Sequence, residues 1–313
     1  MEKEILANFK DVLKYYSTDK INQQKNALDY FESKDIRERS SFGAMKISKI
    51  IGIPFGTVNN WLMGKKIPRA IKGLRELELM NLIPLEISDS LSFKHFVITL
   101  GLRYADGCIY RQKNNNSYTF YICFGDRIDA LNFINDSKIA WNINLNLRFY
   151  PKTHAYYVYL PSSLARLMLV VGSVEGDKTD QNFNLSDSLK IEFLRGLFSG
   201  DGDNPRLKLS GRAAESLRLS LSSHESVAEE FRESFMKDVY ELITGLGIQA
   251  TYPAIKYKQP RISKTGRVTY PIVIRILTNK TNMINFLENI KYTYCNRAIN
   301  KGDIILKVLK DIH

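Results

Sequence analysis

Apolar positions along the chain alternate between helical and strand-like spacing, and the order of the two kinds repeats once. Residues 118–124 show the strand pattern: Tyr118, Phe120, Ile122 and Phe124 share one face, and Thr119, Tyr121 and Cys123 share the other. The first series predicts strands at 108–113 and 118–124, a helix at 127–135, strands at 145–150 and 156–160, and a helix at 163–171. The second predicts strands at 206–209 and 217–222, a helix at 227–246, strands at 249–255 and 270–277, and a helix at 281–290.

A short motif of nine residues precedes each series, at residues 99–107 and within residues 193–202, where it starts at Leu194. Each motif reads apolar, variable, Gly, Leu, two variable residues, a small residue, Asp and Gly. Its small residues lie four positions apart: Gly101 and Ala105, and Gly196 and Gly200. On a helix this spacing makes one flat stripe against which a second backbone can pack closely. The glycine after each acid suits the left-handed end of a helix.

Two such helices packed together bring Asp106 and Asp201 near each other. A carboxylate at a helix C-terminus is disfavoured by the helix dipole, and two neighbouring carboxylates resist joint ionisation. A divalent cation relieves both effects, and Mg²⁺ sites commonly combine one or two carboxylates with substrate phosphate oxygens. The alternative for a single copy is an ordinary helix cap and turn, but two copies in the same context favour a site.

Both motifs resemble the LAGLIDADG motif of the homing endonuclease family. The resemblance implies an α+β fold of two αββαββα halves related by pseudo-two-fold symmetry, with the motif helices at their interface. It implies that Asp106 and Asp201 bind Mg²⁺ or Mn²⁺ for phosphodiester hydrolysis, with the backbone carbonyls of Ala105 and Gly200 as further ligands. The sixth motif position departs from the family's usual acid, since Tyr104 and Ser199 stand there.

Relatives in this family often add a lysine near the fourth strand of a half, which polarises the attacking water. Lys258 and Lys280 are the candidates in the second half. In the first half residues 156–161 hold no lysine, so the resemblance implies unequal halves.

A net charge of +12 and a pI of about 9.4 favour a polyanionic partner, because Lys and Arg neutralise phosphates. The three cysteines have no paired spacing, so neither a disulfide framework nor a zinc finger is expected. No signal peptide or membrane-spanning run is found. We therefore expect an intracellular protein, in the cytoplasm, at the nucleoid or in an organelle.

Residues 46–63 resemble a helix-turn-helix. The first helix is expected to bury Ile47, Ile50 and Ile51, with Gly52 at the turn and Ile53 beneath it. The second helix is expected to bury Val58 together with either Trp61 or Leu62. Outward-facing base contacts are assigned to Thr57, Asn59 and Asn60, and phosphate contacts to Lys65, Lys66 and Arg69. An ordinary helical hairpin is the alternative.

Pro84 and the polar run after it suggest a domain boundary. We expect a helical N-terminal domain over 1–84, a linker over 85–92, and LAGLIDADG halves over 93–187 and 188–313. The other residues expected to contact DNA are basic and lie on the sheets or their loops: Arg111, Lys113, Arg148, Lys152, Arg206, Lys208, Arg218, Lys256, Arg261 and Arg275. A solvated sheet face or loop explains any one of them equally well.

The sequence thus predicts a site-specific, metal-dependent endonuclease that cuts both strands of double-stranded DNA. A transcription regulator that binds DNA without cutting it and an RNA maturase are the alternatives. Two motifs in one chain favour a monomer, and neither end carries intein splice-junction residues, so a free-standing protein is expected.

Overall fold

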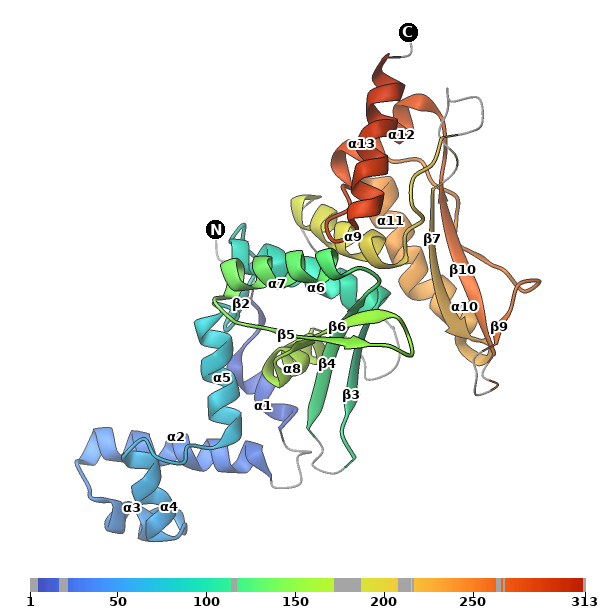
Figure 1. Cartoon of the computed structure of the whole chain (residues 1–313). Coiled ribbons are helices and arrows are strands. Elements are labelled where there is room, and N and C mark those ends of the chain that lie inside the picture. The colour runs from blue at the N-terminus through green and yellow to red at the C-terminus, as the bar shows by residue number, and fades with distance from the viewer. Residues whose placement is uncertain are drawn as a thin grey trace.

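A computed structural model describes residues 5–16, 22–113, 117–171, 187–207, 215, 217–262, 266 and 268–311. It is a mixed α/β structure in which the sheets are antiparallel (Figure 1). Most of the buried apolar side chains form one continuous core. None of the helices in the described ranges has the length and apolar character needed to cross a membrane.

The N-terminal part is mainly helical. Its elements are β1 (Ile5–Ala7), α1 (Phe9–Lys14), α2 (Gln23–Ser40), α3 (Ala44–Ile51), α4 (Phe55–Leu62), α5 (Arg69–Leu79) and β2 (Leu85–Glu86). Helices α2, α3 and α4 form a lobe at one end of the molecule, and α5 connects this lobe to the rest (Figure 1).

The next part holds a four-stranded sheet. Its elements are α6 (Leu91–Ala105), β3 (Gly107–Arg111), β4 (Tyr118–Phe124), α7 (Arg127–Trp141), β5 (Asn146–Tyr150), β6 (Ala155–Leu160) and α8 (Ser162–Val170). The strand order is β3-β4-β6-β5. Burial alternates along β4 as its apolar pattern predicts, because helices pack on one face of the sheet only.

The C-terminal part holds the second sheet, ordered β7-β10-β8 with β9 also paired to β10. Its elements are α9 (Asp187–Asp201), β7 (Leu217–His224), a 3₁₀ turn (Glu225–Val227), α10 (Ala228–Phe231), a π-helical segment (Arg232–Met236), α11 (Lys237–Gly245), β8 (Ala254–Ile255), β9 (Arg261–Ile262), β10 (Val268–Ile276), α12 (Lys280–Asn289) and α13 (Asn296–Asp311). Leucines of β7 and isoleucines of β10 form its buried layer.

The expected elements and the observed ones differ mainly in length. Helix α7 continues six residues beyond the expected end at residue 135, because Ser137 and Trp141 are buried on its far turns. The strand expected over 249–255 is reduced to β8 and an isolated bridge at Ala250. Helix α13 was not expected, and it buries Ala298, Gly302, Ile305 and Leu309 at helical spacing. Residues 114–116, between the first two expected strands, and residues 208–214, which include the end of the strand expected at 206–209, lie outside the described residues.

Contacts cross the boundary expected at residue 84. Strand β1 pairs with β2, and the start of α6 at Leu91 shortens the expected linker. The side chain of Arg166 on α8 is fully buried, and its Nε donates a hydrogen bond of 3.2 Å to the carbonyl of Tyr15. Its guanidinium lies 3.8 Å from the ring centre of Tyr16. Residues near the N-terminus therefore complete the core beside α8.

Candidate nucleic-acid cleavage site

The two motif helices α6 and α9 pack backbone to backbone. A Cβ placed on Gly101 would lie 2.8 Å from the backbone nitrogen of Leu197, and one on Gly196 would lie 3.0 Å from that of Leu102. Since real Cβ atoms essentially never come closer than about 3 Å to another heavy atom, the crossing requires glycine at both positions. This contact makes the C-terminal ends of the two helices neighbours.

Asp106 caps the end of α6. Its backbone N–H donates to the carbonyl of Leu102 at 2.9 Å, and its own carbonyl accepts from Cys123 on β4 at 3.1 Å. The residue is exposed, and Oδ2 of its carboxylate lies 3.1 Å from the Cβ position of Gly200 on α9. The first acid therefore lies against the second motif, one residue before Asp201.

Asp201 ends α9 and is half-buried. The next residues attach to β7, because Gly202 bridges to Leu219 and the Asp203 N–H donates to the carbonyl of Arg218 at 2.8 Å. The Asp203 carboxylate also accepts from Nε of Arg218 at 2.6 Å. This charged hydrogen bond raises the pKa of Arg218 above its ordinary value. Sequence reasoning missed Asp203, which holds a guanidinium close to the second acid.

The unusual residues at the sixth motif position have structural roles. Tyr104 is buried and stacks on Phe235, with ring centres 4.5 Å apart. The hydroxyl of Ser199 accepts from the backbone N–H of Thr293 at 2.9 Å and of Tyr294 at 3.4 Å. An acid in place of Tyr104 would lie against the ring of Phe235, and an acid in place of Ser199 would lie in a tight contact with the backbone of residues 293 and 294. Packing therefore explains why neither motif has an acid at this position.

The surroundings of Asp106 include two thiols. Burial raises the pKa of Cys123 and of Cys295, and the nearby Asp106 carboxylate raises both further. Both thiols therefore stay protonated at neutral pH. Among the residues that the structure describes, no three His, Cys, Asp or Glu side chains form a group that could hold a metal ion. Any cation here would depend on the two acids together with carbonyl or ligand oxygens.

The predicted lysines lie on the second half. Lys258 is exposed on the loop between β8 and β9, and Lys280 is the exposed first residue of α12. The backbone of Lys256 pairs with Pro271, which is opposite Ser222 and three residues along β7 from Leu219. Leu219 is the bridge partner of Gly202, which directly follows Asp201. The loop holding Lys258 therefore begins three residues along β7 from the bridge that positions Asp201.

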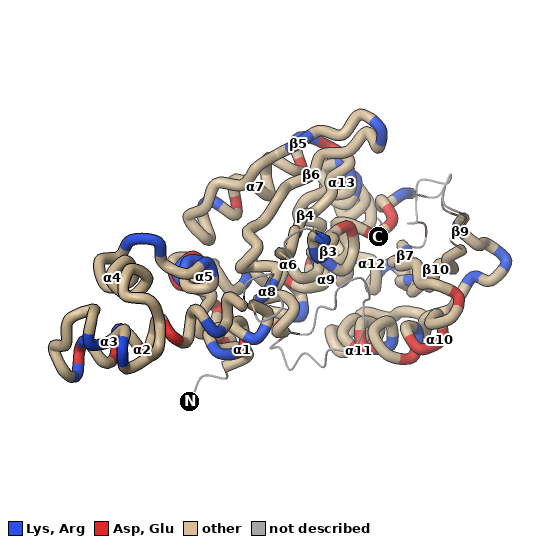
Figure 2. Tube along the Cα trace, turned by 90° about the horizontal axis from the view of Figure 1, so that it is seen from below, with Lys and Arg blue, Asp and Glu red and all other residues tan. Residues whose placement is uncertain are grey.

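Most predicted DNA contacts are surface cations at the ends and open faces of the two sheets. Figure 2 shows basic residues at the turn between α4 and α5, at the β5–β6 turn and around β9, whereas acidic residues gather on α10 and α11. The exposed members are Lys65, Lys66, Arg69, Lys113, Arg148, Lys152, Arg206, Arg218, Arg261 and Arg275. Lys256 is half-buried, and Lys208 lies outside the described residues.

Arg111 differs from the other cations. It is half-buried and pairs with Tyr118 in the register of β3 and β4. Alternation along β3 gives it the face of the buried Ile109. The structure therefore places Arg111 on the helix-covered face of this sheet and not on its open face.

Helices α3 and α4 meet at Gly52, whose φ of 71° forms the left-handed end of α3. Ile47, Val58 and Trp61 are buried as expected. Ile50 is 53% exposed, so its expected inward position is wrong. On α4 Asn59 is exposed, and Thr57 and Asn60 are half-buried.

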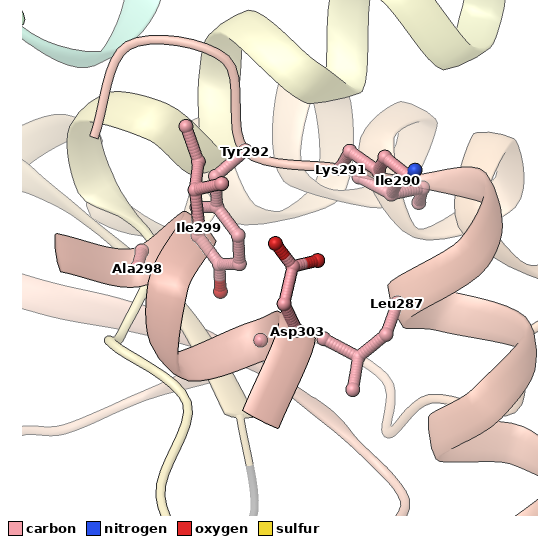
Figure 3. Close-up of a pocket in the computed structure, with 8 residues that line it drawn as sticks. Leu287, Ile290, Lys291, Tyr292, Ala298, Ile299 and Asp303 are labelled. Carbon is pink, nitrogen blue, oxygen red and sulfur yellow. The ribbon is translucent and has the colours of Figure 1, made fainter. Parts of the chain in front are cut away.

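A small cavity of about 120 Å³ lies between α12 and α13 (Figure 3). It is lined by Leu287, Ile290, Lys291, Tyr292, Ala298, Ile299, Gly302 and Asp303. The carboxylate of Asp303 points toward it among mostly apolar side chains (Figure 3). Its lining includes neither motif acid, and the hydroxyl of Tyr292 in the lining donates to the carbonyl of Asp203 at 2.7 Å.

The second motif and the sheet behind it carry a recognised family signature. Residues 188–291 match the family model of the LAGLIDADG-like domain. The match begins in α9 and ends just after α12. It therefore contains Asp201, Arg218 and β10, whereas Asp106 lies outside it.

Known proteins with similar sequence or structure were also found. A tRNA-splicing ligase RtcB from Methanopyrus kandleri is 27% identical over 242 residues, covering 71% of this chain and 23% of that protein. The chain thus spans about a quarter of the length of that relative.

Among solved structures, the homing endonuclease I-DmoI in complex with DNA and Ca has a TM-score of 0.41 and 15% identity, covering 63% of this chain and 88% of that one. The homing endonuclease I-WcaI bound to its DNA recognition sequence has a TM-score of 0.38 and 14% identity, covering 77% and 93%. The N-terminal LAGLIDADG domain of DUF199/WhiA has a TM-score of 0.38 and 14% identity, covering 71% and 93%.

Proposed function

We propose that the protein is a site-specific DNA endonuclease of the homing type, in which Asp106 and Asp201 serve opposite strands of one duplex. The observation that carries this proposal is the glycine contact between α6 and α9, which leaves the Asp106 carboxylate beside Gly200. Two acids at adjoining helix ends are costly for stability alone, because each opposes a helix dipole. Their cost is offset when a cation and a phosphate complete the site.

The residues present fit a divalent cation such as Mg²⁺ or Mn²⁺. Asp106 is exposed and Asp201 half-buried, so both carboxylates can meet a ligand from solvent. The backbone carbonyls of Ala105 and Gly200 are proposed as further donors. Such an ion would lower the pKa of a bound water and stabilise charge on the scissile phosphate. A site with few protein donors suits Mg²⁺, which commonly takes the remaining ligands from water and phosphate.

The chain's own residues hold the substrate in place. Arg218, fixed by Asp203, provides positive charge near Asp201. We propose that Lys258 or Lys280 polarises the attacking water in the second half. Basic side chains along both sheets and the α4–α5 turn would neutralise phosphates and set the register of the duplex.

The remaining features complete the same proposal. We infer that residues 93–187 and 188–313 are the two halves of a pseudo-symmetric monomer. In support, the order β4-β6-β5 in the first sheet matches β7-β10-β8 in the second, in both sheet position and chain order. We also infer that α3 and α4 act as a helix-turn-helix, with Asn59 the most accessible base contact.

One assay tests the proposal. A library of duplexes is incubated with the protein in Mg²⁺, in Mn²⁺ and in EDTA, and double-strand breaks are mapped. Metal-dependent breaks at one sequence are expected, and the double variant Asp106→Asn, Asp201→Asn should bind that sequence without cutting it. Undiminished cleavage by the double variant would remove the assignment of the acids.

A non-cleaving transcription regulator is the second candidate, and one observation favours it. The open sheet face beside Asp106 carries Tyr121 and Tyr159. None of the strands of this sheet, β3, β4, β5 and β6, contains a lysine. Binding of a defined sequence by the parent, with no break or nick in either metal, would establish the regulator instead.

A further inference from the structure

The two sheets can be aligned through the residue that follows each acid. Gly107 pairs with Ile122 in the first sheet, and Gly202 bridges to Leu219 in the second. Ile122 and Leu219 are both fully buried. This shared register relates each position of β4 to one position of β7.

The alignment relates Tyr121 on β4 to Arg218 on β7, since each precedes the buried residue by one position. Their cross-strand partners correspond as well. Tyr121 is directly opposite Tyr159 on β6, and Arg218 is directly opposite Arg275 on β10. Successive strand residues point to opposite faces, so all four side chains lie on the open faces, away from the helices. Each half thus presents one facing pair near its acid, and the two pairs differ in chemistry.

The arginine pair is highly charged. Like charges directly opposite each other on a sheet are destabilising. The Asp203 carboxylate offsets this repulsion, because it accepts a hydrogen bond from Nε of Arg218. That hydrogen bond does not use the two terminal nitrogens of the Arg218 guanidinium. Arg275 is exposed, and its side chain forms no hydrogen bond or ion pair with any described residue. A guanidinium whose terminal nitrogens are available in this way can donate two parallel hydrogen bonds to the O6 and N7 of guanine.

The tyrosine pair is uncharged and half-buried. The hydroxyls of Tyr159 and Tyr150 are 2.6 Å apart, and the ring centres of Tyr121 and Tyr159 are 5.9 Å apart. Burial raises the pKa of Tyr159 to about 12 and that of Tyr121 above its ordinary value, so both stay neutral. The Arg148 guanidinium lies 5.2 Å from the ring centre of Tyr159, and beside it the packed rings offer apolar surface. In the major groove apolar surface favours the methyl group of thymine.

We propose that the two sheets read chemically different half-sites: Arg218 and Arg275 read guanine in one, and Tyr121 and Tyr159 read thymine in the other. This rests on the proposed function, because it requires that both open faces contact duplex DNA. The target is accordingly not a palindrome, and its two halves differ in base composition at equivalent positions.

The test is selection of bound duplexes from a randomised library, with Ca²⁺ present and cleavage excluded from the readout. The parent should recover sequences with guanine on one side and A·T pairs on the other. Arg275→Gln should lose about 5- to 140-fold discrimination at the guanine positions alone. Tyr159→Ala should lose the thymine preference alone. Lys138→Gln removes an exposed cation from α7 on the helix side, and should leave both preferences intact.

Tyr159→Arg provides a second, positive test in case the alanine variant unfolds. It should introduce guanine preference on the thymine side. Identical base preferences in the two halves of the parent's sites would overturn the proposal. The proposal would also be overturned if Arg275→Gln bound all sequences more weakly by the same factor and with a lower salt dependence. That result would show that Arg275 contacts a phosphate and not a base.

The recovered duplexes are then exposed to Mg²⁺. If the recovered sites have two different halves and are never cut, the half-site inference stands and the proposed endonuclease function is wrong. If the recovered sites are palindromic and are cut, the endonuclease function stands and the half-site inference is wrong. Recovery of no sequence above background would overturn both.

Discussion

The Cβ position of Gly200 on α9 lies 3.1 Å from Oδ2 of Asp106 at the end of α6. The first acid therefore touches the second motif, although the two are far apart in the sequence. The relationship depends on the glycine crossing one turn earlier, at Gly101 and Gly196. Any change that separates the helices is expected to alter the site and the stability together.

Gly101→Ala should lower the free energy of unfolding by about 1–3 kcal/mol, because its Cβ meets the backbone of α9 at 2.8 Å. Backbone cannot rotate away, so the helices must shift. Urea unfolding followed by circular dichroism measures the change. Gly245→Ala on α11 is the matched control, since nothing lies within 4 Å of its Cβ position. Equal effects of the two substitutions would contradict the close crossing.

Asp106→Asn and Asp201→Asn, made singly, should each leave slow nicking of one strand. Each substitution removes one negative charge and keeps the side-chain shape, so DNA binding should be equal to the parent's or tighter. A duplex labelled differently on its two strands reports which strand is cut. If both single variants nicked the same strand, the assignment of one acid to each strand would be wrong.

Arg166→Met should lower the free energy of unfolding by about 2–4 kcal/mol, because it leaves the carbonyl of Tyr15 without its buried donor and removes the contact with the Tyr16 ring. Arg148→Met is the control: Arg148 is exposed and lies over the ring of Tyr159 at 5.2 Å. Chemical denaturation measures both variants. A small effect at Arg166 would show that the N-terminal residues contribute little to the core beside α8.

His95 should make the protein less stable in acid. Burial lowers its pKa from 6.5 to about 3, so the folded state keeps it neutral where the unfolded chain binds a proton. As pH falls from 6.5 towards 3, this difference lowers the free energy of unfolding by up to about 1.4 kcal/mol per pH unit. Denaturation across this range measures the slope.

His95→Phe should lose that part of the slope. Ser137, its hydrogen-bond partner, also donates to the carbonyl of Phe133, so the variant leaves no hydroxyl unpaired. Buried Asp129 acts with the opposite sign, because its pKa is raised and its protonation favours the folded state as pH falls. The comparison of parent and variant removes this common contribution. Identical slopes would contradict the burial of a neutral imidazole.

The sequence by itself determined the local elements and the two motifs. Alternation along residues 118–124 predicts β4 with its bounds, because a sheet covered on one face requires apolar residues at every second position. The small residues of each motif predicted a close helix contact, because larger side chains would hold the two backbones apart. The positions of Asp106 and Asp201 at helix ends followed from the same pattern.

The tertiary structure decided what these elements meet. Nothing local in the sequence reveals that Arg166 is buried against Tyr15 and Tyr16, or that Ser199 accepts hydrogen bonds from Thr293 and Tyr294. These contacts join segments separated by many residues, and packing alone selects them. Strand register likewise places Arg111 on the covered face and sets Arg275 opposite Arg218. A shift of one residue reverses a side chain's face, and only the assembled sheet fixes that choice.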